Sequence, residues 1–429
     1  MIAIIGGGIT GLALGWELDL AGVPFQVFEA ADRPGGVIRS GVVDGHVLDW
    51  GPQRVRLTAG LDEMIRDLKL GEEVIRATGG MDLFVYHSGR LRKVPFDLQE
   101  FLRTDALSWK GKARLLLEPF LPGPSPEESV GRFLRRKLGR EVYDHIVGPL
   151  YGGLYSSDPD DMVMRLSLQK VLDHFGIGRS LVARLVQNRA SIPRPPAISF
   201  RGGMQVLTDA LAERLGDRIR LGCRADAIRR VGDRWEVRAG ESVVKAEHVV
   251  LCLPAGPAAG LLSSSLPEAA KRIARLRYNP LAVVHVQSDA DLSGLGFKVS
   301  FAEETPLRGV TYNHSVFART GLYSVYLGGS SQQDVVDLPD EELGALGVQE
   351  FERTVGASAR VLAVRRERMP AWDASWGALD GLELPPTLHI AANWESRPGV
   401  PGRLAQARAV ARRLVTVGAD GGRLSQTAA

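Results

Sequence analysis

The hydrophobic pattern at the start of the chain is that of a short buried strand that leads directly into a helix. Ile2–Ile5 is an uninterrupted run of β-branched and small apolar residues, typical of a parallel strand that is covered on both faces. Gly6, Gly8 and Gly11 follow at the spacing that permits a tight turn, close approach of a pyrophosphate and close packing of helix on sheet. The pattern predicts a dinucleotide-binding strand, turn and helix.

The second strand of this unit ends in an acidic residue. Phe25–Phe28 leads to Glu29, at the position where a carboxylate accepts the 2′-hydroxyl of an adenosine ribose and would repel a 2′-phosphate. The segment Arg33-Pro-Gly-Gly36 follows, and a nicotinamide-binding unit has no need of this second glycine pair. The segment therefore favours FAD over NAD or NADP.

Later parts of the chain alternate between helical and strand patterns. The range 95–186 is rich in helix formers and contains a basic helix at 129–137, for which we weigh a solvated face with Phe133 and Leu134 inward against contact with an anionic membrane. Strands are expected to rejoin the first sheet at 219–221, 234–238 and 248–253. An antiparallel sheet is expected from 281–287, 299–301, 309–313 and 323–327, followed by a buried strand at 388–392 and a helix at 403–415.

These elements predict an α/β plus α+β fold in three parts. The first is a Rossmann-like, two-dinucleotide-binding FAD domain, discontinuous over 1–53, 198–262 and 386–417. The second is an antiparallel-sheet substrate domain over 54–94 and 263–385. The third is a helical, membrane-facing subdomain over 95–197.

Composition excludes several classes of partner. The chain has 429 residues, 45% hydrophobic and 24% charged, with a formal net charge of +3, so nucleic acid is not the expected partner. Cys223 and Cys252 lie in apolar runs and are expected to be buried thiols, with no metal site. The glycine turn at residue 6 leaves no room for a signal peptide, and no stretch reaches the ~20 apolar residues of a membrane span. We expect a cytoplasmic protein, with peripheral contact on the inner face of the membrane as an open alternative.

Four further motifs carry a family resemblance. They are Trp50-Gly-Pro-Gln-Arg-Val-Arg56, Glu128-Ser-Val-Gly-Arg-Phe133, Pro149-Leu-Tyr-Gly-Gly-Leu-Tyr-Ser-Ser-Asp158 and Gly202-Gly-Met-Gln. With the N-terminal glycines, they make the chain resemble the protoporphyrinogen and coproporphyrinogen oxidases of the FAD-dependent amine-oxidase superfamily. The resemblance covers most of the chain.

The resemblance implies a non-covalently bound FAD held from both ends of the chain. The matching positions are Gly6, Gly7, Gly8, Ile9, Thr10, Gly11, Glu29, Ala30, Arg33, Gly35, Gly36, Val37, Gly51, Pro52, Gln53, Arg54, Ala225, Asn393, Gly399 and Val400. The chain departs from its relatives at Ala392, where glycine is usual, and at Gly402, where an acid is common. An alanine that needed positive φ would crowd the cofactor.

The resemblance also implies the reaction. A porphyrinogen, protoporphyrinogen IX or coproporphyrinogen III, would be oxidised to the porphyrin by hydride transfer to flavin N5, with oxygen as acceptor, in heme biosynthesis. The flavin performs the redox step, so no residue is assigned as catalytic. Arg56 is the expected anchor for the substrate propionates, and Val310 and Tyr312 are candidate walls of the substrate slot.

Two alternatives stay open. One is a flavin amine oxidase acting on a small amine or polyamine, for which Lys298 would be the lysine near the flavin, although its setting Gly296-Phe-Lys-Val-Ser does not resemble that enzyme's segment. The other is a non-catalytic protein that binds FAD or porphyrin, which the residues Ala392 and Gly402 favour. Neither the oligomeric state nor the choice between the two porphyrinogens follows from the sequence.

Overall fold

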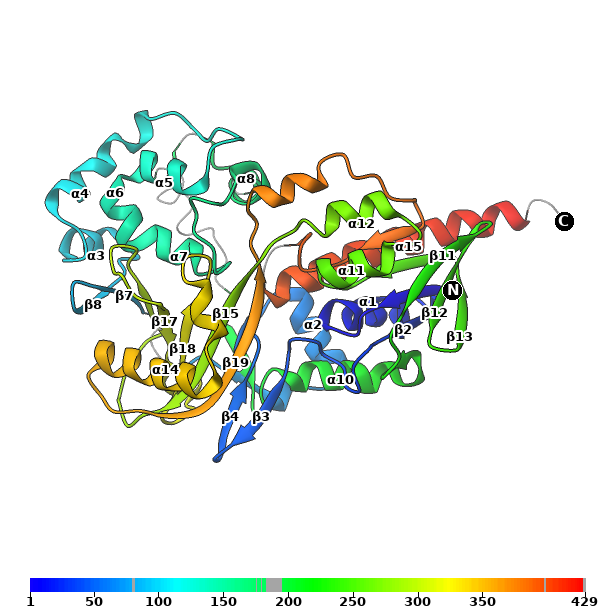
Figure 1. Ribbon diagram of the computed structural model, residues 1–429, viewed down its shortest axis with the longest axis horizontal. Helices are drawn as coiled ribbons and strands as arrows, with labels where there is room; N and C mark the ends of the chain where they lie inside the picture. Colours follow the sequence, from blue (N-terminus) through cyan, green and yellow to red (C-terminus); the bar gives the residue numbers. More distant parts are fainter. Residues whose placement is uncertain (79–81, 175, 179, 183–194, 397–398, 427–429) are drawn as a thin grey trace.

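The computed structural model describes residues 1–78, 82–174, 176–178, 180–182, 195–396 and 399–426. It has a mixed α/β architecture with a parallel sheet toward one end and a larger, mostly antiparallel sheet toward the other (Figure 1). A group of short helices covers the far end of the larger sheet (Figure 1). The predicted helical range 95–197 includes residues 183–194, which lie outside the described part.

The parallel sheet is built from segments far apart in the chain. Its strand order is β10 (Ile219–Arg220), β2 (Phe25–Phe28), β1 (Ile2–Ile5), β14 (His248–Leu251) and β20 (Leu388–Ile390). Ile2 and Ile4 pack on one face, with helices α1 (Ile9–Leu20), α10 (Gln205–Leu215) and α15 (Val400–Gln426). Ala3 and Ile5 pack on the other. Both faces are thus covered, which explains the unbroken apolar runs in the sequence.

The expected strand at 234–238 does not join the parallel sheet. It is β12 (Arg234–Ala239), the middle strand of an antiparallel sheet with β11 (Ala227–Val231) and β13 (Ser242–Ala246). Gly232 and Gly240, at φ 63° and 60°, turn the chain directly back on itself. Such tight turns join antiparallel neighbours, whereas a parallel strand needs a long crossover.

The larger sheet has seven strands and two different faces. Its order is β19 (Arg360–Pro370), β15 (Tyr278–Gln287), β18 (Leu322–Gly328), β17 (Leu307–Thr311), β16 (Gly296–Val299), β7 (Leu83–His87) and β8 (Arg90–Lys93). All neighbours are antiparallel except β16 and β7. Ala282, Val284 and Val286 of β15 pack in one core with Leu343 and Phe351 of α14 (Asp340–Val355). The residues between them point to the opposite face.

Smaller elements complete the described fold. They are the hairpin β3 (Ser40–Val43) and β4 (His46–Asp49), the three-stranded sheet of β5 (Val55–Arg56), β9 (Ala197–Phe200) and β6 (Val74–Arg76), and the helices α2 (Ala59–Asp67), α11 (Ala255–Leu262), α12 (Pro267–Ile273) and α13 (Asn313–Phe317). Short 3-10 turns include η1 (Gly71–Glu73), η5 (Gly216–Arg218), η6 (Gln333–Asp337) and η7 (Ala374–Leu379).

The helical part is a chain of short helices. They are α3 (Leu98–Arg103), α4 (Trp109–Arg114), η2 (Leu115–Phe120), α5 (Val130–Leu138), α6 (Arg140–Val142), η3 (Tyr143–Val147), α7 (Gly148–Gly152), η4 (Met164–Leu166) and α8 (Gln169–His174). Among the described residues, no helix combines the length and the apolar character that a membrane crossing requires.

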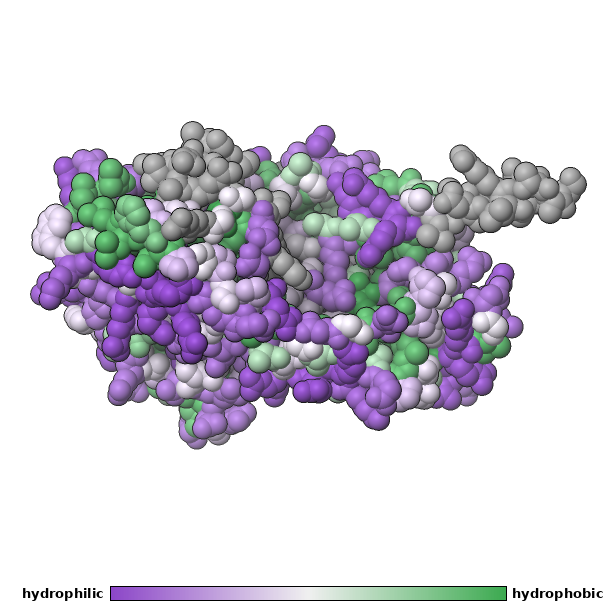
Figure 2. Space-filling model, turned by 90° about the horizontal axis from the view of Figure 1, so that it is seen from above, coloured by the Kyte–Doolittle hydropathy of each residue, from purple (hydrophilic) through white to green (hydrophobic). Residues whose placement is uncertain are grey.

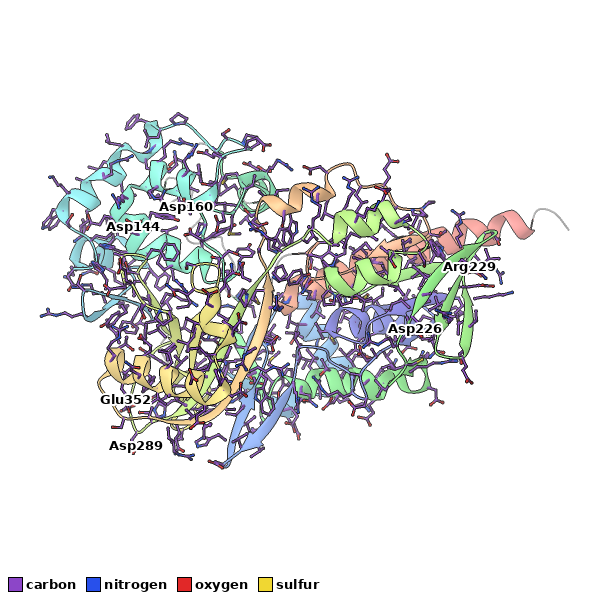
Figure 3. The ribbon with its side chains drawn as sticks, viewed as in Figure 1. Asp144, Asp160, Asp226, Arg229, Asp289 and Glu352 are labelled. Atoms are coloured by element: carbon purple, nitrogen blue, oxygen red, sulfur yellow. The ribbon has the colours of Figure 1, made fainter. Side chains whose placement is uncertain are left out.

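The basic helix at 129–137 is only partly solvated. Phe133 and Leu134 of α5 are buried as expected, but Lys137 is buried too, with Nζ 2.9 Å from Glu118 Oε1. Arg135 pairs with Asp160, whose side chain lies among these helices (Figure 3). Arg136 pairs with Glu128 at 2.7 Å. The three C-terminal charges of the run are therefore used within the protein.

Candidate active site

The glycine turn after β1 leaves no space for a side chain at Gly6 or at Gly11. Gly6 has φ 109°, and a Cβ on it would lie 2.7 Å from the carbonyl oxygen of Cys252. A Cβ on Gly11 would lie 2.0 Å from the carbonyl oxygen of Gly6, so only glycine lets α1 begin this close to the strand. The N-terminus of α1 is consequently bare backbone, the kind of surface that accepts a pyrophosphate.

Glu29 is held beside this turn by backbone donors. Its Oε2 accepts a hydrogen bond from the amide of Gly7 at 2.6 Å, and its Oε1 accepts one from the amide of Ala31 at 2.8 Å. The loop that carries Ala225 runs alongside, since the amide of Cys223 donates to the carbonyl of Glu29 at 2.8 Å. The carboxylate, Ala30 and Ala225 therefore lie at the end of β2, where an adenosine is expected.

The second glycine pair packs directly on the first turn. The amide of Gly35 donates to the carbonyl of Gly7 at 2.8 Å, and a Cβ on Gly36, at φ 60°, would lie 3.2 Å from the Cα of Gly8. Arg33 donates to the carbonyls of Pro34 and Gly36 at 3.2 and 3.0 Å, so its side chain shapes this loop. Two glycine loops that touch form one continuous cradle, which fits an extended dinucleotide.

A cavity of about 940 Å³ begins at this cradle. Its lining includes predicted positions from both ends of the chain, namely Ile9, Val37, Gly51, Pro52, Gln53, Arg54, Asn393, Gly399 and Val400. The predicted positions Gly6, Gly7, Gly8, Thr10, Gly11, Glu29, Ala30, Arg33, Gly35, Gly36 and Ala225 are not part of this lining; they form or adjoin the turn and its neighbouring loops. The residues present thus fit FAD, whose contacts with them stay a prediction.

The C-terminal wall of the cavity is fixed by a network around Asn393. Tyr278 Oη donates to Asn393 Oδ1 at 2.8 Å, and Arg403 donates to the carbonyls of Ala392 and Asn393 at 3.0 and 3.3 Å. Burial lowers the pKa of Arg403 to about 10. Ala392 is not among the non-glycine residues with positive φ, so alanine is accommodated here without backbone strain.

One face of the seven-stranded sheet forms the opposite wall. The lining takes Leu281 and Val283 from β15, Lys298 from β16, Thr311 from β17, Tyr326 from β18 and Met369 from β19. Because side chains alternate across a strand, Val310 and Tyr312 point the other way. They are 2% and 1% exposed and lie in the core beneath α14, so neither lines the cavity.

Arg56 also lies outside the cavity. Its exposed side chain donates to the carbonyl of Pro195 at 3.0 Å. Arg54, two residues earlier, lines the cavity instead and forms no hydrogen bond or ion pair with any residue that the structure describes. Burial lowers its pKa, and Arg56 adds to that effect.

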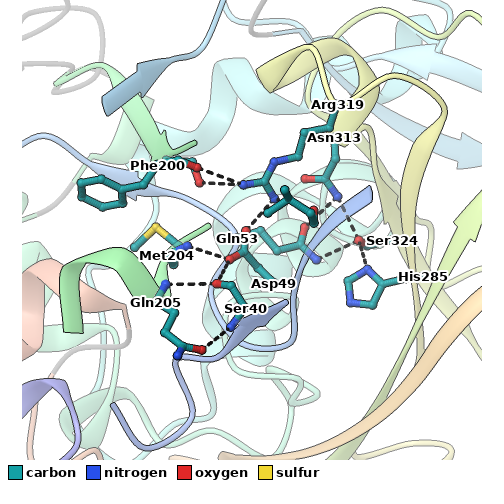
Figure 4. Close-up of polar contacts among 12 residues, drawn as sticks. Ser40, Asp49, Gln53, Phe200, Met204, Gln205, His285, Asn313, Arg319 and Ser324 are labelled. Carbon is teal, nitrogen blue, oxygen red and sulfur yellow. Dashed lines mark hydrogen bonds and ion pairs between the residues drawn. The ribbon is translucent and has the colours of Figure 1, made fainter. Parts of the chain in front are cut away.

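The side chain of Gln53 is held in a buried polar network (Figure 4). Its Nε2 donates to Ser324 Oγ at 2.8 Å, and its Oε1 accepts from Asn313 Nδ2 at 3.2 Å. Ser324 Oγ also lies 3.0 Å from His285 Nδ1. The side-chain amide of Gln53 is therefore engaged within the protein.

Several lining residues have no role that was predicted from the sequence. Trp372, with φ 55°, is stacked on Trp376 with ring centroids 5.3 Å apart, and it presents an aromatic wall to the cavity. Lys298 also lines the cavity, and the sequence suggests a role for it only as the lysine of an amine oxidase. A lysine within the apolar strand Gly296–Val299 is the signal that the sequence offers, because a lysine is almost never fully buried unless it has a partner.

Comparisons with known proteins agree with this geometry. Residues 9–415 match the family described as flavin containing amine oxidoreductase. The chain is 29% identical over 410 residues to protoporphyrinogen oxidase 1, chloroplastic, of Spinacia oleracea, covering 84% of this chain and 73% of the relative. It is 27% identical over 469 residues to coproporphyrinogen III oxidase of Propionibacterium freudenreichii subsp. freudenreichii, covering 90% and 88%.

A solved structure from Exiguobacterium sp. 255-15, provisionally assigned as a protoporphyrinogen oxidase, has a TM-score of 0.79 to this fold. The two are 22% identical, and the match covers 97% of this chain and 98% of the other. At that identity the likeness concerns the fold alone.

Proposed function

The chain belongs to the family of flavin containing amine oxidoreductases, and we propose that it oxidises a porphyrinogen to the porphyrin as a step of heme biosynthesis. It is an FAD-dependent oxidoreductase that resembles protoporphyrinogen oxidase. The names of its relatives support both protoporphyrinogen IX and coproporphyrinogen III as the substrate. We propose oxygen as the electron acceptor.

One observation carries the proposal: a single large cavity is bounded both by the flavin side of the glycine cradle and by an apolar sheet face. Val37 and Val400 come from the cofactor side, whereas Leu281, Val283 and Met369 come from the sheet. Ligand sites in this range of volume hold molecules of drug size or larger. A flat macrocycle with apolar faces and charged edges suits such a space.

The chemistry is divided between cofactor and protein. Bound FAD supplies the redox chemistry by accepting a hydride at N5. The apolar walls exclude water from the reacting faces, and Trp372 offers a flat ring against the macrocycle. We transfer the role of propionate anchor from Arg56 to Arg54, because only Arg54 reaches the cavity.

We propose that FAD is bound non-covalently through the positions predicted from the sequence. Neither cysteine is part of the cavity lining, and burial raises the pKa of the Cys252 thiol to about 12, which disfavours the nucleophilic thiolate. We also propose that the three predicted domains have separate roles. The first binds FAD, the second binds the substrate, and the helical subdomain contacts the membrane.

We propose that the membrane contact is made by α3, α4 and η2 and not by the basic helix. Leu98, Trp109 and Leu116 are 68%, 72% and 74% exposed there, and Lys110 and Arg114 lie among them. Figure 2 shows a hydrophobic area at the end of the molecule that carries these helices. Apolar side chains beside cations fit the surface of an anionic bilayer. We propose a cytoplasmic protein that touches the membrane peripherally at this surface.

Anaerobic mixing tests the function. The protein reconstituted with FAD is mixed with protoporphyrinogen IX, coproporphyrinogen III or putrescine, and the visible flavin band is followed. Bleaching by a porphyrinogen and not by putrescine is expected. Bleaching by the amine alone would establish the amine oxidase, and a bound flavin that no substrate bleaches would establish the non-catalytic alternative.

A further inference from the structure

Lys298 reaches Tyr326 across a glycine on the cavity side of the seven-stranded sheet. The strand register places Lys298 opposite Gly309 and Gly309 opposite Tyr326, so the three positions form one row on one face. Gly309 has φ 152°, and a Cβ on it would lie 3.2 Å from Lys298 Cδ. The missing side chain leaves room for the lysine, whose Nζ lies 5.6 Å from the centroid of the Tyr326 ring.

Arg54 brings a second positive charge to the same wall. Both Arg54 and Lys298 line the cavity, and the charge of Arg54 adds to burial in lowering the pKa of Lys298. Neither has a carboxylate partner within the described part of the chain. Two partly buried cations without a counter-charge are costly, and the cost is relieved when an anion binds.

Four carboxylates line the cavity, those of Asp158, Glu303, Glu304 and Glu367, and none of them pairs with Arg54 or Lys298 among the described residues. Glu367 lies 3.0 Å from Arg365, and Glu303 accepts a hydrogen bond from the amide of Ser88 at 2.6 Å. Asp158 accepts from the amide of Asp160 at 2.9 Å. These three carboxylates are thus engaged elsewhere, and Glu304 is not among the groups that act on the pKa of Arg54 or Lys298.

We propose that Arg54 and Lys298 together form a carboxylate-binding site, with Tyr326 as its floor, that holds an acidic side chain of the substrate. The inference rests on the proposed function and deepens it, since it assigns the site that orients a carboxylated macrocycle in the cavity. Arg54 supplies a planar fork for the two carboxylate oxygens, and Lys298 supplies a point charge. The same two charges repel a protonated amine, which disfavours polyamines.

Porphyrin binding tests the site independently of turnover. The probes are coproporphyrin III and its tetramethyl ester, which has the same ring without the charges, and affinity is followed by quenching of protein fluorescence at pH 7. The FAD-loaded protein is expected to bind the acid about tenfold or more tightly than the ester, a difference of about 1.4 kcal/mol or more. Arg54→Gln and Lys298→Met should each remove most of this preference and leave ester affinity unchanged.

Arg56→Gln is the matched control. It removes the same charge from a residue that is two positions after Arg54 and whose side chain lies outside the cavity. It should bind both probes as the wild type does. The site is refuted if acid and ester bind equally to the wild type, or if Arg56→Gln loses the preference as fully as Arg54→Gln does. Variants that retain their flavin spectrum are folded well enough for the comparison.

The pH profile gives a second readout. The pKa of Lys298 is lowered to about 8, mainly by burial and to a smaller extent by the charge of Arg54. Among the described residues, the charged and titratable groups that face it are Arg54 and Tyr326. Acid affinity should therefore fall as the pH rises through 8 in the wild type and stay level in Lys298→Arg, since the guanidinium keeps its charge. An identical fall in both would refute the role of Lys298.

Failure of this site and failure of the proposed function are distinguishable. Flavin bleaching by a porphyrinogen with no preference for the acid probe would retain the function and discard the site. A clear acid preference without any bleaching would retain the site on a protein that binds porphyrin but does not oxidise it.

Discussion

Arg319 Nη1 lies 2.7 Å from Asp49 Oδ2, and the two side chains are only 8% and 1% exposed. Asp49 ends the β3–β4 hairpin beside the cofactor cradle, whereas Arg319 precedes β18 of the larger sheet. Asp49 also accepts hydrogen bonds from Ser40 Oγ and the amide of Met204, at 2.6 and 2.7 Å (Figure 4). This ion pair ties the parallel-sheet side of the molecule to the substrate wall.

Removing one partner of this pair should be strongly destabilising. Arg319→Met leaves the carboxylate of Asp49 buried without its counter-charge, which costs about 3–5 kcal/mol in the free energy of unfolding. The control is Arg360→Met. Arg360 lies 2.7 Å from Asp44 on the same hairpin, but the two side chains are 53% and 57% exposed, so its loss should cost less than about 1 kcal/mol. Urea titration of both variants checks this, and equal losses would contradict it.

The buried network predicts a pH dependence of stability. The pKa of His285 is lowered from 6.5 to about 4, mainly by burial and to a smaller extent by the charge of Arg319. Asp49 and Ser324 also face this ring. Between these two values the unfolded state binds a proton that the native state does not, so the free energy of unfolding rises with pH across this window. His285 contributes up to roughly 3 kcal/mol to that rise. Acid titrations of unfolding in wild type and His285→Gln check it, because the variant should lose that share of the slope.

The exposed surface of α3, α4 and η2 predicts binding to vesicles. Replacing Trp109 and Leu116 together by serine removes two apolar side chains, each worth about 1.5–3 kcal/mol when buried, so the bound fraction should fall by more than about tenfold. Val243→Ser, at an exposed position of β13, is the control. Co-sedimentation with phosphatidylcholine vesicles, with and without phosphatidylglycerol, measures it. If the double variant sediments as the wild type does, this surface is not the membrane contact.

Much of the fold could be predicted because local patterns specify it. Ile2–Ile5 and the glycines after it specify a buried strand that turns tightly into a helix, and the β-branched residues of Leu281–Gln287 specify a strand. The substrate wall could not be predicted in the same way, since both faces of the larger sheet are apolar: Leu281 and Val283 face the cavity, whereas Ala282 faces α14. Periodicity alone therefore did not show which face is open.

The sequence also could not show which of Arg54 and Arg56 reaches the cavity. Arg54 and Arg56 are two residues apart and would share a face of a regular strand, but β5 begins at Val55, so Arg54 precedes the pleat and turns into the cavity. Lys137 gives a third case, because its partner Glu118 lies 19 residues earlier and only tertiary packing brings the two together.

We expect Arg403 to strengthen the binding of FAD. Its guanidinium donates to the carbonyls of Ala392 and Asn393 and to Ser396, so it fixes the turn after β20 against the start of α15. No carboxylate pairs with it in the described part of the chain, so a negatively charged cofactor also gains from its charge. Arg403→Met should weaken FAD binding by about tenfold, equivalent to 1.4 kcal/mol.

The control for this variant is Arg412→Met, at an exposed position on the same helix. FAD titration of the apoprotein, followed by the quenching of flavin fluorescence, gives both dissociation constants, and thermal unfolding without FAD reports any general loss of stability. Because the turn after β20 carries Asn393 into the cavity wall, a loosened turn should weaken FAD more than it weakens the fold. An Arg403→Met protein that binds FAD as tightly as Arg412→Met would show that the guanidinium holds the turn without contributing to the cofactor site.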